Sequence, residues 1–154
     1  MTGVQTCALP ISLTVSPGAS YYAITLGGQQ IGFASNKIDT LPDALRLEDQ
    51  MLLQVPALGV IERVDARTEV HLTRALVLTG FDATLRSSSA RFAARGQVLG
   101  DSLLTVEIES ADDRRTLDVR LDEPLVLPGL LPVLLAYGGG LEVGKTLTVA
   151  MFDP

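Results

Sequence analysis

The residue pattern with the most specific chemistry is a glycine-rich run near the C-terminus. Residues 139–146 match Gly-x4-Gly-Lys-Thr, with Gly139, Gly144, Lys145 and Thr146 at the defining positions. Such a loop binds nucleotide phosphates when it follows a strand and opens a helix, because backbone N–H groups and the lysine then face the phosphates. Here an apolar, helix-like segment comes first and a strand-like segment follows. We therefore predict a structural turn and no nucleotide cofactor.

Three further ionisable residues are of types that catalysis uses. His71 is the single histidine, and a catalytic role would need a nucleophile or carboxylate partner beside it. It continues the charged face of a strand, which indicates a solvated surface histidine. Glu107 and Glu109 lie two apart and share a strand face, but alternation beside polar turns places such residues outward. We predict no catalytic residue in this chain.

The basic residues do not predict a nucleic-acid surface. Arg86, Arg91 and Arg95 could form a patch, but the net charge is −6 and no aromatic residues alternate with the arginines. Residues 112–115, Asp-Asp-Arg-Arg, read as a turn with local charge compensation and not as a calcium loop. With a single cysteine there is no cysteine-rich metal site and no internal disulfide.

Length and composition describe one domain with an aliphatic core. The chain has 154 residues, 47% of them hydrophobic but only 5% aromatic, and it lacks tryptophan. Leu, Val, Ile and Ala must therefore build the core. The longest apolar run, residues 125–137, is too short to span a bilayer and contains Pro128 and Pro132. We predict no transmembrane segment.

The first residues do not read as part of a natural protein. Residues 1–11 match the in-frame translation of a common short-read sequencing adapter, so we expect residues 1–12 to be a leader outside the fold. Cys7 then carries no function, and a native export signal would be missing. Residues 13–19 stay unassigned, and residues 20–154 are predicted to form a single domain.

Short runs with period-two alternation fill most of that domain and predict antiparallel strands. Tyr22, Ile24 and Leu26 share one face of a first strand, and residues 27–30 supply a hairpin turn before a return strand at 31–38. Later strands are expected at 45–55, 61–72, 76–85, 90–98, 104–108, 117–121 and 146–152. Closely spaced turns favour a meander, in which consecutive strands are neighbours.

The strand at 61–72 shows the expected character of the sheet most clearly. Charged residues of alternating sign fall on one face and apolar residues on the other. The charged positions are Arg63, Asp65, Arg67 and Glu69, and the apolar positions are Val64, Ala66, Val70 and Leu72.

One leucine-rich segment lacks alternation and predicts a short helix near 129–137. Pro128 and Pro132 bracket a first helical turn, and residues 138–140 offer a glycine stop. A buried strand is the alternative, but Pro132 has no N–H for a sheet. We predict a mainly β fold, a curved, half-barrel-like antiparallel meander packed on this helix. Leu131, Leu134 and Leu135 are expected to be buried against its concave side.

Two segments resemble the N-terminal β-rich region of bacterial transglutaminase-like (papain-superfamily) proteins. Residues 21–33, Tyr-Tyr-Ala-Ile-Thr-Leu-Gly-Gly-Gln-Gln-Ile-Gly-Phe, look like the opening strand and its "G-x-x-I-G" hairpin. Residues 140–145, Gly-Leu-Glu-Val-Gly-Lys, and the closing Phe-Asp-Pro look like the end of that region. The architecture is also similar to bacterial half-barrel lipoprotein carriers, in which a curved sheet wraps a helix.

The resemblance implies a non-catalytic structural or interaction domain, with a Cys-His-Asp catalytic domain downstream as its partner. It also implies a periplasmic or secreted parent protein. The alternative is a half-barrel module that binds a lipid or other apolar ligand. How fully residues 130–135 fill the concave face separates the two, since a filled face is a core and an empty one is a ligand cavity.

Overall fold

The computed structural model describes residues 15–57, 59–100, 102–123, 125–137, 143–144, 146 and 148–152. The adapter-like residues 1–12 lie outside this part of the chain, as do Gly139 and Lys145 of the glycine-rich run.

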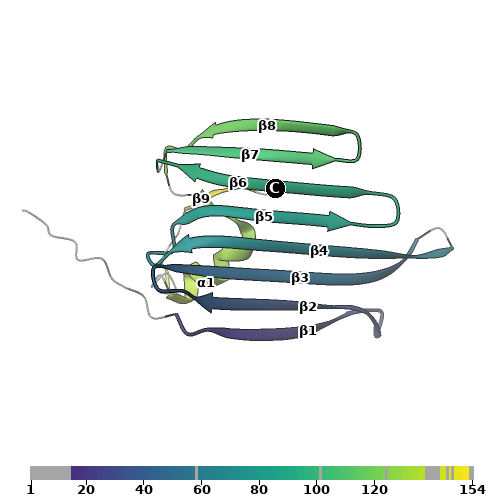
Figure 1. Cartoon of the computed structure of the whole chain (residues 1–154). Helices are drawn as coiled ribbons and strands as arrows, with labels where there is room; N and C mark the ends of the chain where they lie inside the picture. The colour runs from purple at the N-terminus through teal and green to yellow at the C-terminus, as the bar shows by residue number, and fades with distance from the viewer. Residues whose placement is uncertain are drawn as a thin grey trace, which may run out of the picture.

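Eight antiparallel strands form one open sheet in which every neighbour in space is also a neighbour in sequence, as Figure 1 shows. The strands are β1 (Gly18–Leu26), β2 (Gln29–Thr40), β3 (Ala44–Ala57), β4 (Val60–Thr73), β5 (Leu78–Arg86), β6 (Arg91–Leu99), β7 (Leu103–Ser110) and β8 (Asp113–Arg120). The predicted meander is confirmed, and the sheet is half-barrel-like and not closed.

Tight turns make this order possible. Between β1 and β2 the two turn residues Gly27 and Gly28 have φ of 58° and 80°. Both angles lie in the left-handed region, which two-residue hairpin turns require and which glycine adopts without steric cost. The sequence pattern Gly-Gly between two alternating runs therefore specifies the first hairpin directly.

Alternation gives the sheet one apolar and one charged face. On β4 the buried Val70 and Leu72 pair across the ladder with the buried Leu47 and Leu45 of β3. Residues directly opposite each other in an antiparallel pair share a face, so the apolar face runs from strand to strand. The hydrophobic core on this face comprises Val15, Leu45, Leu47, Val70, Leu72, Leu76, Leu78, Phe81, Ala83, Ala94, Leu104, Val106, Val126, Leu127 and Leu130. Val15 belongs to the segment that the sequence left unassigned.

The C-terminal segment covers part of the apolar face. It contains β9 (Leu125–Val126), the 3-10 turn η1 (Pro128–Leu130), α1 (Leu131–Tyr137) and β10 (Ala150–Met151), which pairs parallel with β9. The predicted helix near 129–137 is confirmed. The last strand is shorter than expected, since among the described residues of the predicted range (146 and 148–152) only Ala150 and Met151 are in a strand.

The prediction of which leucines are buried was wrong in detail. Leu130, in η1, is 2% exposed, whereas α1 itself has no fully buried residue. Leu134 packs against the core while partly exposed, and Leu131 and Leu135 are half-buried. The reason is geometric, because a helix of seven residues that rests on a sheet presents only a narrow stripe to it. The η1 turn, which comes first, makes the closest approach.

Phe81 is the centre of the core. Its side chain is fully buried, and its cross-strand partner on β6 is Gly96. A Cβ built on Gly96 would meet the Phe81 ring, with the Cζ atom only 2.6 Å away. The ring also lies 5.9 Å, centroid to centroid, from the ring of Phe152 in the C-terminal segment. Gly96 therefore provides the space in which Phe81 joins the sheet to its cover.

Candidate functional site

Within the described residues, the apolar face of the sheet is covered at one end of the strands only. In Figure 1 α1 lies behind one end of β2 to β5, and no helix or strand lies behind the other end. Two adjacent open cavities, of about 280 and 240 Å³, occupy the uncovered region and share Asp49, Ala66 and Thr68 in their lining. We call this region the trough. Its first cavity reaches Tyr22 and Met51, and its second reaches the η1 turn.

The trough is mostly apolar, with one carboxylate near its middle. Asp49 lies on the apolar face because it is two positions along β3 from the buried Leu47. Its cross-strand partner is Thr68 of β4. Its Oδ1 atom accepts a hydrogen bond of 2.6 Å from the side-chain amide of Asn36 on β2. The trough therefore has one carboxyl group, hydrogen-bonded to an amide, among largely apolar walls.

A second carboxylate lies on the same face of β4, two residues beyond Val64. Glu62 accepts hydrogen bonds of 3.0 Å from the hydroxyl groups of Ser88 and of Ser89, both in the β5–β6 turn. These bonds hold the pKa of Glu62 below its ordinary value, with Ser88 as the larger cause. The arrangement ties the β5–β6 turn to β4 and gives the uncovered face a polar end.

The opposite face of the sheet is charged and also has a depression. A cavity of about 400 Å³ is lined by Gln50, Asp65, Arg67, Glu69, Asp82, Thr84 and Arg86. Carboxylates and guanidinium groups alternate in this lining, so neither sign dominates. Ion pairs of 3.2 Å between Arg67 and Glu48 and of 3.5 Å between Arg67 and Glu69 show local compensation. This face has no concentrated field that would select an ionic ligand.

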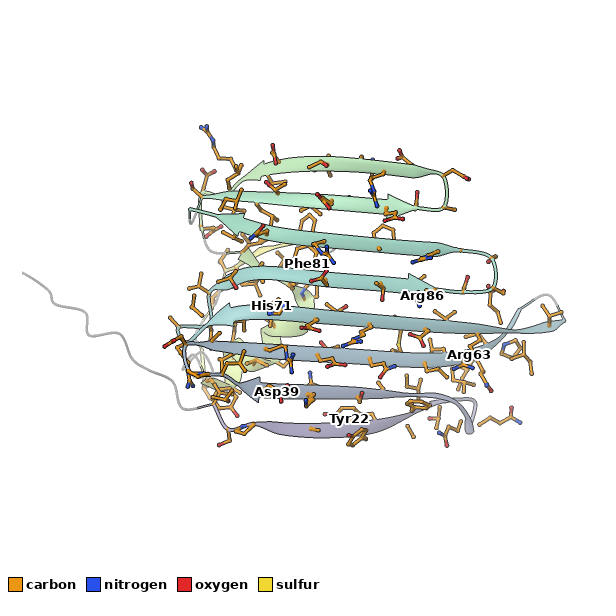
Figure 2. All side chains as sticks on the ribbon, viewed as in Figure 1. Tyr22, Asp39, Arg63, His71, Phe81 and Arg86 are labelled. Atoms are coloured by element: carbon orange, nitrogen blue, oxygen red, sulfur yellow. The ribbon has the colours of Figure 1, made fainter. Side chains whose placement is uncertain are left out.

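His71 lies on this charged face, where the sequence places it (Figure 2). Its Nε2 atom is 3.5 Å from Oε1 of Glu69, and its side chain is 43% exposed. Arg46 is its cross-strand partner on β3. Among the described residues no serine or cysteine side chain forms a hydrogen bond with His71. The geometry places His71 beside a surface carboxylate and, within the described residues, beside no serine or cysteine nucleophile.

The two glutamates of β7 are also outward. Glu107 and Glu109 are exposed on the charged face, and Oε2 of Glu109 accepts a hydrogen bond of 2.8 Å from Arg114 of β8. This bond lowers the pKa of Glu109, so the carboxyl group stays ionised. A pair in which one member is a general acid would need a raised pKa instead.

The three arginines do not make one patch. Arg86 and Arg91 are cross-strand partners at the β5–β6 hairpin, while Arg95 lies further along β6. The Arg95 Nε atom donates a hydrogen bond of 2.6 Å to Asp82, which compensates its charge. In residues 112–115, Arg114 pairs with Glu109 across the β7–β8 hairpin. Of these four residues only Asp112 lies in the turn, since β8 begins at Asp113, and the charge of Arg114 is compensated by the neighbouring strand β7.

The described flanks of the glycine-rich run have the order helix, loop, strand. α1 precedes the run and β10 follows it. Gly144 is in a turn with φ of 84°, and Thr146 belongs to no element. A phosphate-binding loop needs a strand before it and a helix after it. The positions of Gly139 and Lys145 lie outside the described residues.

Two further features are absent from the described ranges. They contain no group of three or more His, Cys, Asp or Glu side chains that could hold a metal ion. Within the same ranges no helix is both long and apolar enough to cross a membrane.

Sequence reasoning missed the trough residues. The signal was present in β3, where Leu45, Leu47, Met51, Leu53 and Val55 alternate and Asp49 interrupts them. A charged residue inside an otherwise apolar stripe indicates that the stripe is not buried along its whole length. The stripe is longer than a seven-residue helix can cover.

Comparison with known proteins gave no matching family model, no matching curated protein and no matching solved structure.

Proposed function

We propose that this chain is a non-catalytic interaction domain, and that its trough packs against an apolar surface of a neighbouring domain of the parent protein. The observation that supports this is the half-covered apolar face. Leu85 at 39% exposure and Tyr22 at 57% remain accessible there beyond the reach of α1. Large exposed apolar regions on soluble domains usually mark interaction sites.

The open shape of the trough favours a broad partner over a small ligand. Each cavity, at about 280 and 240 Å³, is below the usual range of ligand pockets, about 300–1,000 Å³, although together they fall within it. Burying one methylene group fully is worth about 0.8 kcal/mol. An acyl chain in an open trough buries only part of each methylene group, so each group contributes less than this value. A binding free energy of roughly 4 kcal/mol gives only a millimolar dissociation constant, so weak binding of an acyl chain is expected. A protein surface that closes the trough buries more apolar surface and therefore gains more binding free energy.

The partner we propose is the transglutaminase-like catalytic domain that the resemblance implies downstream of this region. The exposed charged face and the trough would then have separate roles, with the first facing solvent and the second facing the partner. Because the described residues offer no nucleophile–base pair, catalysis would belong to that partner.

The second candidate is a half-barrel module that binds a lipid or other apolar ligand. The observation that favours it is Asp49, since a hydrogen-bonding group among apolar walls is typical of sites that orient an amphiphilic ligand. The anionic Asp49 would repel a fatty-acid carboxylate, so the ligand's head group would have to be neutral or cationic.

One titration separates the candidates. The ¹⁵N-labelled chain is mixed with the domain encoded downstream in the source genome, and amide shifts are followed by NMR. We expect shifts around Asp49, Ala66 and Thr68. Ala66→Arg places a charge in the trough and should abolish them. Ala93→Arg is the matched control, because Ala93 is also half-buried but lies on the charged face.

Shifts confined to the charged face, or none, would contradict the proposed docking. A parallel titration with dodecyl alcohol and dodecylamine tests the ligand candidate. Saturable binding to the isolated chain well below millimolar concentration, lost in Ala66→Arg, would support the ligand-binding module in place of the docking domain.

A further inference from the structure

The two edges of the sheet are built differently. β1 and β8 are the outermost strands of the eight-stranded sheet in the described part of the chain. β8 is exposed at every position, and five of its eight residues are charged. Edge strands present unpaired N–H and C=O groups, and charged side chains are a common device that keeps other strands away. β8 is protected in this way.

β1 has no such protection. Its nine residues, Gly-Ala-Ser-Tyr-Tyr-Ala-Ile-Thr-Leu, include no charged residue and no proline, and all but one are exposed. The absence of charge continues through β2 as far as Asn36. Large apolar side chains are exposed on both faces of this hairpin, with Tyr21 at 80%, Tyr22 at 57% and Phe33 at 49%. Figure 2 shows Tyr22 on the outermost strand.

We propose that β1 pairs antiparallel with β1 of a second copy of this chain, around a two-fold axis at Tyr22. The pairing joins the two eight-stranded sheets into one continuous sheet, and it does not depend on the docking proposed for the trough.

The choice of a second copy follows from charge and symmetry. An uncharged edge offers no charge complementarity to an acidic or basic strand, whereas a two-fold interface needs only self-complementarity. Pairing of β1 with β8 of another copy would set an uncharged strand against five charged residues and would propagate without closing. The closed β1–β1 pair avoids both consequences.

The register follows from the faces and the side-chain sizes. If the apolar faces of both copies stay on one side, each residue must pair with one on the same face. Centring on Tyr22 satisfies this condition and pairs all nine residues of β1. It sets Tyr21 opposite Ala23 and Leu26 opposite Gly18, so these large side chains meet small ones. The exception is Tyr22, which meets Tyr22 of the second copy on the axis.

The experiment measures the molar mass of the intact chain by sedimentation equilibrium over about 5 µM to 1 mM. A single strand pair buries little area, so we expect a dissociation constant of about 10–100 µM. Tyr22→Lys and Tyr22→Glu should each weaken dimerisation at least about tenfold, because like charges would lie directly opposite each other. An equimolar mixture of the two variants should dimerise again.

Leu117→Lys on β8 is the matched control, since Leu117 is 41% exposed on the same face of the opposite edge, and it should leave the dimer unchanged. Ala66→Arg in the trough should also leave it unchanged. Two results with the wild-type chain would overturn the proposal: a monomer at about 1 mM, or open-ended oligomers. Tyr22 variants that dimerise as tightly as wild type would also overturn it. Circular dichroism verifies that each variant is folded. If a variant is unfolded, hydrogen exchange of the wild-type chain replaces the variant experiment. Protection of the β1 amides should then increase with protein concentration, and unchanged protection would refute the pairing.

Discussion

The packing of Phe81 on Gly96 predicts a large effect from a single added methyl group. In Gly96→Ala the new Cβ would lie 2.6 Å from the ring Cζ atom. The ring Cε1 atom would be closer still. Carbon atoms pack best at about 3.5–4.0 Å, so the ring would have to retreat by more than about 1 Å. Phe81 has no exposed surface, and Phe152 limits its movement with a centroid 5.9 Å away. We expect Gly96→Ala to lower the free energy of unfolding by about 1–3 kcal/mol through overpacking.

The assay is urea denaturation of the two single variants and the double variant, Gly96→Ala with Phe81→Leu. Leucine is shorter than phenylalanine and leaves room for the methyl group, so Phe81→Leu should lose stability alone yet relieve the overpacking in the double variant. We expect the double variant to be more stable than the sum of the single losses predicts, by about 0.5–3 kcal/mol.

Gly18→Ala provides the control for a glycine in a strand. No atom lies within 4 Å of a Cβ built there, and the residue is not in the left-handed region. We expect an unchanged or slightly raised stability, by up to about 1 kcal/mol, because alanine restricts the unfolded chain. A loss below about 0.5 kcal/mol for Gly96→Ala, or strictly additive losses with Phe81→Leu, would refute the proposed contact.

Three other outcomes follow from the structure. Leu130→Ala should lower the free energy of unfolding by about 2–5 kcal/mol in urea denaturation, because Leu130 is 2% exposed, while Leu135→Ala should cost clearly less; equal losses would contradict the anchoring by η1. The pKa of Asp39 lies below its ordinary value of 3.8 because Arg46, and then Lys37, donate hydrogen bonds to it. Because the pKa of Asp39 is lower in the folded chain than in the unfolded chain, its ionised form stabilises the fold at pH values above the unfolded pKa. The stability advantage of wild type over Asp39→Asn should therefore be constant near neutral pH and shrink as pH falls below 3.8. An advantage that grows on acidification would be inconsistent with this sign. Isothermal titration with ATP should detect no binding by wild type or by Lys145→Ala, and binding that the substitution removes would show that the order of helix, loop and strand had been misjudged.

The sequence predicts the sheet well because its signals are local. Each strand carries its own alternation, and Gly27 with Gly28 specifies its turn without help from distant residues. The positions of the charged face, including His71 and Glu109, follow from the same period of two.

The cover and the trough were harder to predict because they depend on how far a helix reaches across the sheet. Hydrophobicity indicates that residues 130–135 pack on the sheet, but it does not say which leucine makes the closest contact or where the cover ends. Leu130 is buried because η1 comes first, and Asp49 is half-buried beside Gly129 of the same turn. The Phe81–Gly96 contact is likewise a pairing of distant strand positions that neither strand indicates alone.

The order of the elements along the chain has a consequence for synthesis. The sheet is complete at Arg120, but the segment that covers its apolar face begins only at Leu125 and ends with Phe152. Domains are made from the N-terminus at about 5–20 residues per second, so the finished sheet would spend seconds on the ribosome with its leucines exposed. A chaperone that binds nascent apolar segments would have its longest opportunity in that interval. Ribosome-bound chains stalled when Arg120 has just left the exit tunnel should therefore recruit such a chaperone more strongly than chains stalled after Phe152 has left it.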